Sequence, residues 1–292
     1  MSEGWSDTFG KIFKDSNHIN RELTMYSDMF NFPVEIKQLE WPFNSNFDED
    51  EIHQLLNEFG SKEDHFEFYE FTRTGLGLSR SSIVLFLPSK GHFSIKAFAY
   101  PPPITLALKK PPVNLANYHR MRIQHLIHSL AEHFPETHIL ESPSGNMLMI
   151  FQEFLFHPIC QFNTPQQINQ LIEILSLASR ARILLDYNQS NWLVSGLEFL
   201  YYVDTDYIGH TYVDPDRCLL ENLNQSMAFF TSKNVKSLPQ VLKGYSELSE
   251  THTKFINRFK KVMKKIIESW DKSKLSEENK QKYDIFTQII QS

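Results

Sequence analysis

The sequence predicts an α+β protein in two lobes: a small antiparallel β-sheet with one main helix, followed by a larger, mostly helical part. Three observations predict it. Short β-rich runs occupy 65–98, one long helical pattern covers about 114–134, and helical patterns dominate from Thr164 onward. We therefore expect an N-terminal extension over 1–64, a sheet-bearing lobe over 65–155 and a helical lobe over 156–292.

Composition excludes several classes of protein. The chain has 292 residues, of which 41% are hydrophobic and 22% charged, which is ordinary for a globular protein. A net charge of −6 argues against broad nucleic-acid binding, and two cysteines cannot form a disulfide framework. The first residues lack a signal-peptide pattern, and no apolar run approaches the roughly 18 residues of a membrane span. The sequence therefore predicts a cytoplasmic protein without a membrane span.

Three strands are predicted in series within 65–98. Residues 65–68 alternate, 82–87 form a β-rich run, and 92–98 follow a turn at Pro88–Gly91. The small residues of "RTGLGLSRSS" are typical of a loop. We expect an antiparallel meander, followed by a proline-rich stretch at 101–112 that is either a lid over a ligand or a plain surface loop.

The predicted helix from about Asn114 to Phe134 carries a polar face with His125, His128 and Glu132. These three side chains could hold a metal, although a solvated face opposite the apolar one is the simpler interpretation. Two short strands, 138–140 and 146–151, should follow the helix.

The helical lobe is predicted to begin with Thr164 as an N-cap and Pro165 at the first helical position. Two short β runs, 192–194 and 199–203, interrupt the helical patterns. The basic, amphipathic segment 255–267 is expected to pack by its apolar stripe; contact with anionic lipid, RNA or an acidic partner is the alternative.

Two motifs stand out in the predicted sheet. "TGLGLSRSSIV" places Gly75 and Gly77 between two strands, and glycines let backbone N–H groups approach phosphates without a Cβ in the way. "FSIKAF" places Lys96 on a strand, where its ammonium group suits phosphates as a point charge.

Two further motifs carry oxygen ligands. "LLDYNQSNWLV" sets Asp186 and Asn191 between apolar runs, and "LYYVDTD" ends in Asp204 and Asp206. Carboxylate and amide oxygens are hard ligands that suit Mg²⁺, and a carboxylate can also orient or deprotonate a hydroxyl group. The neighbouring hydrophobic segments should hold Asp186 and Asn191 rigidly.

In this order, the motifs resemble the protein-kinase-like superfamily over about 65–210. Gly75 and Gly77 match the first two glycines of its glycine-rich loop, and Lys96 matches the lysine of its third strand. "MLMIFQEFLFHP" is similar to its fifth strand running into the hinge, with Gln152, Glu153 and Phe154 as hinge candidates. Three positions match the catalytic Asp, the metal-binding Asn and the metal-binding Asp, in the order Asp186, Asn191 and Asp204.

The departures favour the aminoglycoside-phosphotransferase and sugar-kinase-like relatives over eukaryotic-type protein kinases. Leu184-Leu185 stands where a His-Arg or His-Gly pair is usual, and Thr205-Asp206 replaces Phe-Gly. No Ala-Pro-Glu segment follows. Glu132 is the only acidic residue in the predicted helix, and it lies later than the usual partner of the strand lysine.

The resemblance implies a bilobal, kinase-like phosphotransferase that moves the γ-phosphoryl group of ATP, with Mg²⁺, to a hydroxyl acceptor on a small molecule, sugar, lipid headgroup or protein. A pseudokinase that senses nucleotide or binds protein, and a nucleotidyl transferase on the same fold, are the alternatives. A purely structural interpretation makes Lys96 a surface lysine and the three aspartates turn residues. The implied site is catalytic Asp186 and Lys96, nucleotide-binding Gly75, Gly77, Lys96, Glu153 and Phe154, and metal-binding Asn191, Asp204 and Asp206.

Overall fold

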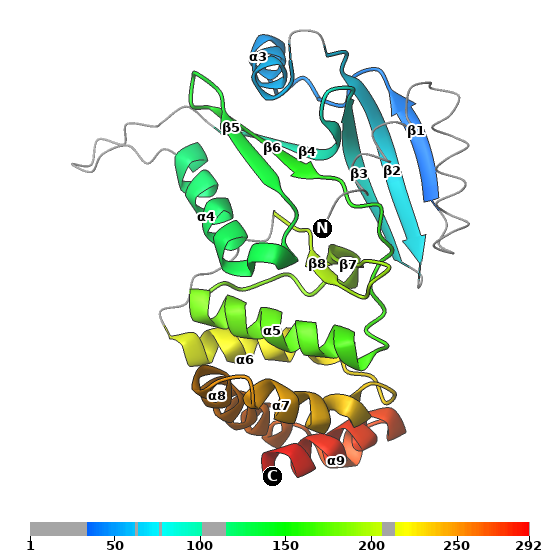
Figure 1. The fold of residues 1–292 in the computed structure, drawn as a ribbon, viewed down its shortest axis with the longest axis vertical. Helices are drawn as coiled ribbons and strands as arrows, with labels where there is room; N and C mark the ends of the chain where they lie inside the picture. The colour runs from blue at the N-terminus through cyan, green and yellow to red at the C-terminus, as the bar shows by residue number, and fades with distance from the viewer. Residues whose placement is uncertain (1–33, 62–63, 76–77, 101–114, 206–213, 292) are drawn as a thin grey trace, which may run out of the picture. The chain divides into compact units, whose positions relative to one another are not determined.

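The structure is a computed structural model, which describes residues 34–291 except 62–63, 76–77, 101–114 and 206–213 (Figure 1). The described residues form a mixed α/β protein with a six-stranded antiparallel sheet, a two-stranded sheet and seven α-helices. The chain divides into two compact units. Unit 1 runs to Gln124 and includes Pro135–Pro158, whereas unit 2 comprises His125–Phe134 and the chain from Ile159 onward.

The large sheet belongs to unit 1, with strand order β1-β2-β3-β4-β6-β5 and every neighbouring pair antiparallel. The predicted meander is confirmed as β2, β3 and β4, and the two strands expected after the long helix are confirmed as β5 and β6. The strands are β1 (Val34–Leu39), β2 (Glu67–Gly75), β3 (Leu78–Leu87), β4 (Gly91–Ala99), β5 (Thr137–Glu141) and β6 (Met147–Glu153).

The loop predicted for "RTGLGLSRSS" is too long. Strand β2 continues to Gly75 and β3 begins at Leu78, so the two strands pair almost to the tip of the hairpin. The hydroxyl groups of Thr72 and Ser81 lie 2.7 Å apart across this ladder. Pairing between the two strands therefore prevails over the turn propensity of the glycine and serine residues in this segment.

One face of the sheet is covered by α3 (Glu49–Phe59). The Asp48 side chain caps this helix by accepting a hydrogen bond from the Glu51 N–H at 3.1 Å. The Phe59 ring stacks on Phe151 of β6 with centroids 3.9 Å apart. Although we expected an N-terminal extension over 1–64, β1 and α3 belong to the same compact unit as the sheet.

The long helix predicted over 114–134 is present as α4 (Leu115–Leu130), followed by a 3-10 turn, η1 (Ala131–His133). Helix α4 is assigned to unit 1 up to Gln124 and to unit 2 beyond it.

Unit 2 contains the small sheet and five further helices (Figure 1). The predicted N-cap of α5 is confirmed, since the Thr164 hydroxyl accepts from the Gln167 N–H at 3.3 Å. The two short β runs are confirmed as an antiparallel hairpin. The elements are α5 (Pro165–Ala181), β7 (Trp192–Val194), β8 (Leu200–Tyr202), α6 (Pro215–Ser226), α7 (Leu238–Ser246), α8 (Glu250–Glu268) and α9 (Glu277–Gln291).

The basic segment 255–267 lies in α8, and its apolar stripe is buried against α6, α7 and α9. The expectation of a packed helix is therefore confirmed. Of the helices in the described ranges, none is both long and apolar enough to cross a membrane.

The turn between β3 and β4 should depend on Gly91, whose φ of 100° is a conformation that other residues rarely adopt. We expect Gly91→Ala to lower the free energy of unfolding by about 1–3 kcal/mol. A Cβ at Gly91 would meet no atom within 4 Å, so backbone strain is the expected cause. Differential scanning calorimetry on the purified chain measures the change.

Gly244→Ala is the matched control. Gly244 lies in α7, and a Cβ there also meets nothing within 4 Å. Alanine favours helix, so this variant should be stabilised by up to about 1 kcal/mol. Equal effects of the two substitutions would contradict the assignment of strain to Gly91.

Candidate functional site

Unit 2 brings Asp186, Asn191 and Asp204 together. The Asn191 Nδ2 group donates to Asp186 Oδ2 at 3.0 Å and to Asp204 Oδ2 at 3.4 Å. Asn191 and Asp204 are only 5% and 6% exposed, while Asp186 is half-buried. Two carboxylates from different segments therefore meet at one amide group.

Local hydrogen bonds fix the loop that carries Asp186 and Asn191. Asp186 Oδ1 accepts from the Asn188 N–H at 3.0 Å, and the Asn188 side chain accepts from the Ser190 N–H at 3.1 Å at the start of the 3-10 turn η2 (Gln189–Asn191). The Val203 N–H donates to the Asn191 carbonyl at 3.0 Å, which ties the turn to the residue before Asp204. The cluster therefore forms where the β7–β8 hairpin opens.

Asn222 of α6 anchors the chain just before Asp186. Its Oδ1 atom accepts from the Leu185 N–H and from the Tyr187 hydroxyl, each at 3.1 Å, and its Nδ2 group donates to the Ile183 carbonyl at 2.8 Å. Sequence reasoning missed Asn222. The signal was an asparagine between Leu219 and Leu223, on what the helical period makes an apolar face.

Two buried tyrosines also hold the segment that carries Asp186. The Tyr202 hydroxyl accepts from the Asp186 N–H at 3.0 Å, and Tyr187 donates to Asn222. Burial raises the pKa of both hydroxyls well above the usual value, and for Tyr202 the negative Asp204 adds to the rise. Both side chains therefore stay protonated, as the hydrogen bond that Tyr187 donates requires.

The cluster contains donor atoms of the kind that a hard divalent cation prefers. Asp186 and Asp204 offer carboxylate oxygens on either side of one buried group, and Asn191 offers an amide oxygen. The amide now turns its NH₂ group toward both carboxylates, so the Asn191 oxygen can become a ligand only if the amide rotates. A cation would then replace the NH₂ group as the partner of the two carboxylates.

Lys96 lies on β4, in unit 1, opposite Ile150 of β6. Phe93 and Ile95 of the same strand are buried in the core under α3. Because side chains alternate along a strand, the half-buried Lys96 belongs to the other face of the sheet. Gly75 is paired with Leu78 at the end of the β2–β3 hairpin.

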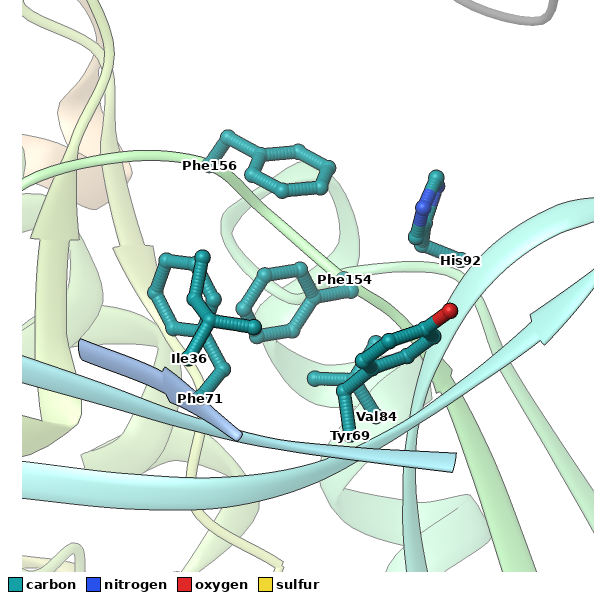
Figure 2. A pocket seen from close by; sticks show the side chains of 7 residues that line it. All are labelled: Ile36, Tyr69, Phe71, Val84, His92, Phe154 and Phe156. Atoms are coloured by element: carbon teal, nitrogen blue, oxygen red, sulfur yellow. The ribbon is translucent and has the colours of Figure 1, made fainter. Parts of the chain in front are cut away.

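The face of the sheet away from α3 carries an apolar cluster that includes Phe154. Figure 2 shows the side chains that line a cavity in this cluster. The cavity has a volume of about 20 Å³, the space of about one water molecule. The Phe154 ring lies 4.8 Å from Phe71 and 4.9 Å from Phe156. The cavity is lined by Ile36, Tyr69, Phe71, Val84, His92, Phe154 and Phe156. Burial lowers the pKa of His92 to about 4, so this imidazole is neutral near pH 7.

The hinge candidates are already engaged within unit 1. The Glu153 N–H donates to the Glu136 carbonyl at 2.8 Å, and the Phe154 N–H donates to the His92 carbonyl at 3.0 Å. A nucleotide bound at these residues would therefore meet their carbonyl groups or side chains. The Phe154 side chain lines the water-sized cavity of Figure 2.

Arg73 of β2 is a second residue that sequence reasoning missed. Its side chain is 2% exposed. The Nε atom donates a hydrogen bond to the His157 carbonyl at 3.1 Å, and the Nη2 atom donates one to the Leu155 carbonyl. Its guanidinium group lies over the rings of Phe71 and Phe154, at 4.9 and 4.5 Å. Burial, with a contribution from Arg80, lowers its pKa to about 9. The sequence did contain a signal for its burial. Arg73 stands two residues after Phe71, so the alternation of a strand places both side chains on the same face of the sheet.

We predicted that His125, His128 and Glu132 share one polar face of the helix, and this prediction is wrong for Glu132. Helix α4 ends at Leu130, and Ala131 takes a left-handed conformation with φ of 47°. Glu132 therefore falls in the 3-10 turn η1, off the helical face. The His125 Nε2 atom lies 2.9 Å from the Ala181 carbonyl, to which it donates.

Three predicted features lie outside the described residues: Gly77, Asp206 and the proline-rich stretch 101–112. No protein-family model matches the chain, and no curated protein matches it. The resemblance to the protein-kinase-like superfamily therefore rests on the residue pattern alone.

The Asn222 network should be required for unit 2 to fold around Asp186. In Asn222→Ala, the buried Leu185 N–H and Ile183 carbonyl groups lose the hydrogen bonds that the Asn222 side chain makes with them. We expect a loss of at least about 2 kcal/mol in the free energy of unfolding, measured by urea denaturation.

Asn224→Ala is the matched control for this variant, because Asn224 is exposed on the same helix. It should change stability by less than about 0.5 kcal/mol. A similar loss of stability in both variants would mean that α6 is destabilised by any such substitution, and that the buried Asn222 amide has no special role.

Proposed function

We propose that this chain is an atypical, kinase-like phosphotransferase that uses ATP and Mg²⁺ to phosphorylate a hydroxyl group. The observation that carries the proposal is the convergence of Asp186, Asn191 and Asp204, which the resemblance assigns to one catalytic site. Asp186 and Asn191 precede the β7–β8 hairpin and Asp204 follows it, and a shared site would account for their meeting at one buried amide.

Asp204 and Asn191 would hold the cation, with Asp206 as a further oxygen ligand. A Mg²⁺ ion held by these residues would neutralise negative charge that develops during transfer. Asp186, the more exposed of the two clustered carboxylates, would orient the acceptor hydroxyl and take its proton. Its Oδ1 atom is held by the Asn188 N–H, which restricts the carboxylate to one orientation.

Unit 1 would supply the phosphate-binding groups. Lys96 offers a positive charge at a point of β4 where the strand pairs with β6, opposite Ile150. Gly75 lies at the end of the paired part of β2, and Gly75 and Gly77 would let backbone N–H groups approach phosphates closely. Glu153 and Phe154 would border the base.

A pseudokinase is the second candidate, and one observation favours it. The Asn191 NH₂ group already satisfies both carboxylates, so the cluster is complete without a cation. In that case the chain would sense nucleotide or bind a protein, and the polar cluster would serve folding.

We also propose a cytoplasmic location for this activity. Cys160 and Cys218 are buried free thiols, which fits the reducing compartment where ATP is plentiful.

The decisive experiment combines binding with turnover. Thermal shift is recorded with ATP, with and without Mg²⁺, and ADP release is then measured with sugars, aminoglycosides, lipid headgroups and protein acceptors. Mg²⁺-dependent stabilisation with ADP release supports phosphotransfer. Pyrophosphate release with AMP transfer would replace it with nucleotidyl transfer, and stabilisation without turnover on any acceptor would favour the pseudokinase.

Lys96→Met should abolish or strongly weaken the thermal shift that ATP produces, because it removes a phosphate-facing charge. The fold should persist, since a half-buried lysine stem is replaced by an apolar side chain of similar length. Lys37→Met is the control, an exposed lysine on β1 of the same sheet. An unchanged ATP response in the Lys96 variant would exclude a phosphate-binding role.

Asp204→Asn and Asp186→Asn should separate metal binding from catalysis. We expect Asp204→Asn to lose the Mg²⁺ dependence of ATP binding. Asp186→Asn should keep ATP affinity within a few-fold but lower turnover by about 10²–10⁴, the usual contribution of a positioned general base.

The exposed Asp284 of α9 gives the matched control, Asp284→Asn, which should behave as the parent chain in both assays. If Asp186→Asn mainly lowers stability, with no selective loss of turnover, its carboxylate has a structural role only.

A further inference from the structure

A second cluster of metal-ligating side chains lies in unit 2, apart from the Asp186 cluster. It consists of Glu132 and His133 in η1 and Glu173 on α5. One donor atom from each side chain lies within 4.8 Å of the other two. The three residues come from two segments that are distant in the sequence, so the fold itself assembles the cluster.

His133 is held with one ring nitrogen directed at this cluster. The side chain is 1% exposed, and its Nδ1 atom lies 2.9 Å from the Leu200 carbonyl of β8. A carbonyl only accepts, so Nδ1 carries a proton and donates it. The ring also stacks on Phe199, with centroids 4.9 Å apart and planes 10° apart. These contacts fix the ring plane and leave Nε2 facing the two carboxylates.

The Nε2 atom of His133 is buried and has no hydrogen-bond partner among the described residues. Its nearest charged neighbour is the Glu173 Oε2 atom, at 3.6 Å. That distance is too long for a good hydrogen bond. A buried polar atom without a partner is costly, so a bound group that satisfies Nε2 would be favoured.

The same distance suits two ligands of one metal ion. Bonds of about 2.0–2.1 Å to a tetrahedral zinc ion place its ligand atoms roughly 3.4 Å apart. Glu173 is half-buried and Glu132 is exposed, so both carboxylates have room to adjust around the fixed imidazole. A histidine that donates through Nδ1 to a backbone carbonyl also matches the usual support of a metal-bound imidazole.

We propose that Glu132, His133 and Glu173 form a binding site for a divalent first-row transition metal ion, with Zn²⁺ as the best fit. An imidazole ligand favours zinc over Mg²⁺ and Ca²⁺, which prefer oxygen ligands alone. Three protein ligands leave a fourth position, on the side of the exposed Glu132, for water or another ligand. The proposal is independent of phosphotransfer, since it uses none of the residues assigned to that reaction.

The metal would connect three elements of unit 2. It would join η1 to α5 directly, and through the Nδ1–H of His133 it would also reach β8. Strand β8 ends at Tyr202, two residues before Asp204. The bound ion would therefore stabilise the hairpin next to the Asp186 cluster.

The test uses the whole chain after treatment with a chelator. Zn²⁺, Co²⁺ and Mg²⁺ are added separately, and stoichiometry, melting temperature and the visible spectrum of the Co²⁺ form are recorded. We expect one Zn²⁺ per chain and a rise of about 5–10 °C in the melting temperature at a hundredfold excess over Kd. Co²⁺ should give d–d absorption bands, and Mg²⁺ should not compete for this site.

Variants locate the site. Glu132→Gln and Glu173→Gln should each weaken Zn²⁺ binding by more than the roughly 10–100-fold that the loss of a supporting hydrogen bond costs. His138→Gln is the control, because His138 and Glu136 form an exposed histidine–glutamate pair with atoms 3.0 Å apart. That variant should bind Zn²⁺ as the parent chain does.

The competing explanation is an ion pair between a protonated His133 and Glu173. It predicts no stoichiometric Zn²⁺, no Co²⁺ bands and no metal-dependent change in melting temperature, and that result would overturn the proposal. His133→Gln alone is a poor test, because the buried ring also supports packing. Glu132 is exposed, so unchanged Zn²⁺ affinity in a folded Glu132→Gln variant would also refute the site.

Discussion

The segment from Ile183 to Asn191 has little regular structure of its own, yet much of it is buried. Its backbone N–H and carbonyl groups must therefore find partners elsewhere, because an unpaired buried polar group is expensive. Asn222 supplies two of these partners from α6, and the Tyr202 hydroxyl supplies a third from β8. The position of Asp186 follows from this requirement, and so does its distance from Asn191 and Asp204.

The same polar network limits how the Asp186 cluster can change. A carboxylate held by a backbone N–H on one oxygen and an amide on the other has little freedom to rotate. Asn191 is different, because turning its amide exchanges a donor for an acceptor without moving the backbone. The candidate site therefore has an adjustable amide beside a carboxylate, that of Asp186, whose orientation is fixed. Rotation of that amide is the reorganisation that the proposed cation would require.

Most helices and strands could be predicted from the sequence, because their signals are local. Alternation and turn residues identify the meander, and Thr164-Pro165 identifies the start of α5. The convergence of Asp186, Asn191 and Asp204 was expected from the resemblance, and the structure brings the three together.

The errors and omissions have physical causes that local patterns do not contain. Periodicity assumed that Glu132 continued the helix, whereas a left-handed Ala131 ends it. Arg73, Asn222 and His133 owe their importance to partners far along the chain, namely the Leu155 and His157 carbonyls, the Ile183–Tyr187 segment and the Leu200 carbonyl. Nothing in their immediate sequence indicates those partners.

The division of α4 between the two units has a practical consequence for dissecting the protein. The chain passes from one unit to the other at 124–125, at 134–135 and at 158–159. No single cut can therefore release both units whole. A fragment that starts at Ile159 would lack the His133 ring and the Nδ1–H that it offers to Leu200, and it would leave one face of Phe199 bare. An intact second unit could be made alone only if residues 125–134 were joined to the fragment. The two units alternate along the sequence, so they cannot be separated as consecutive domains.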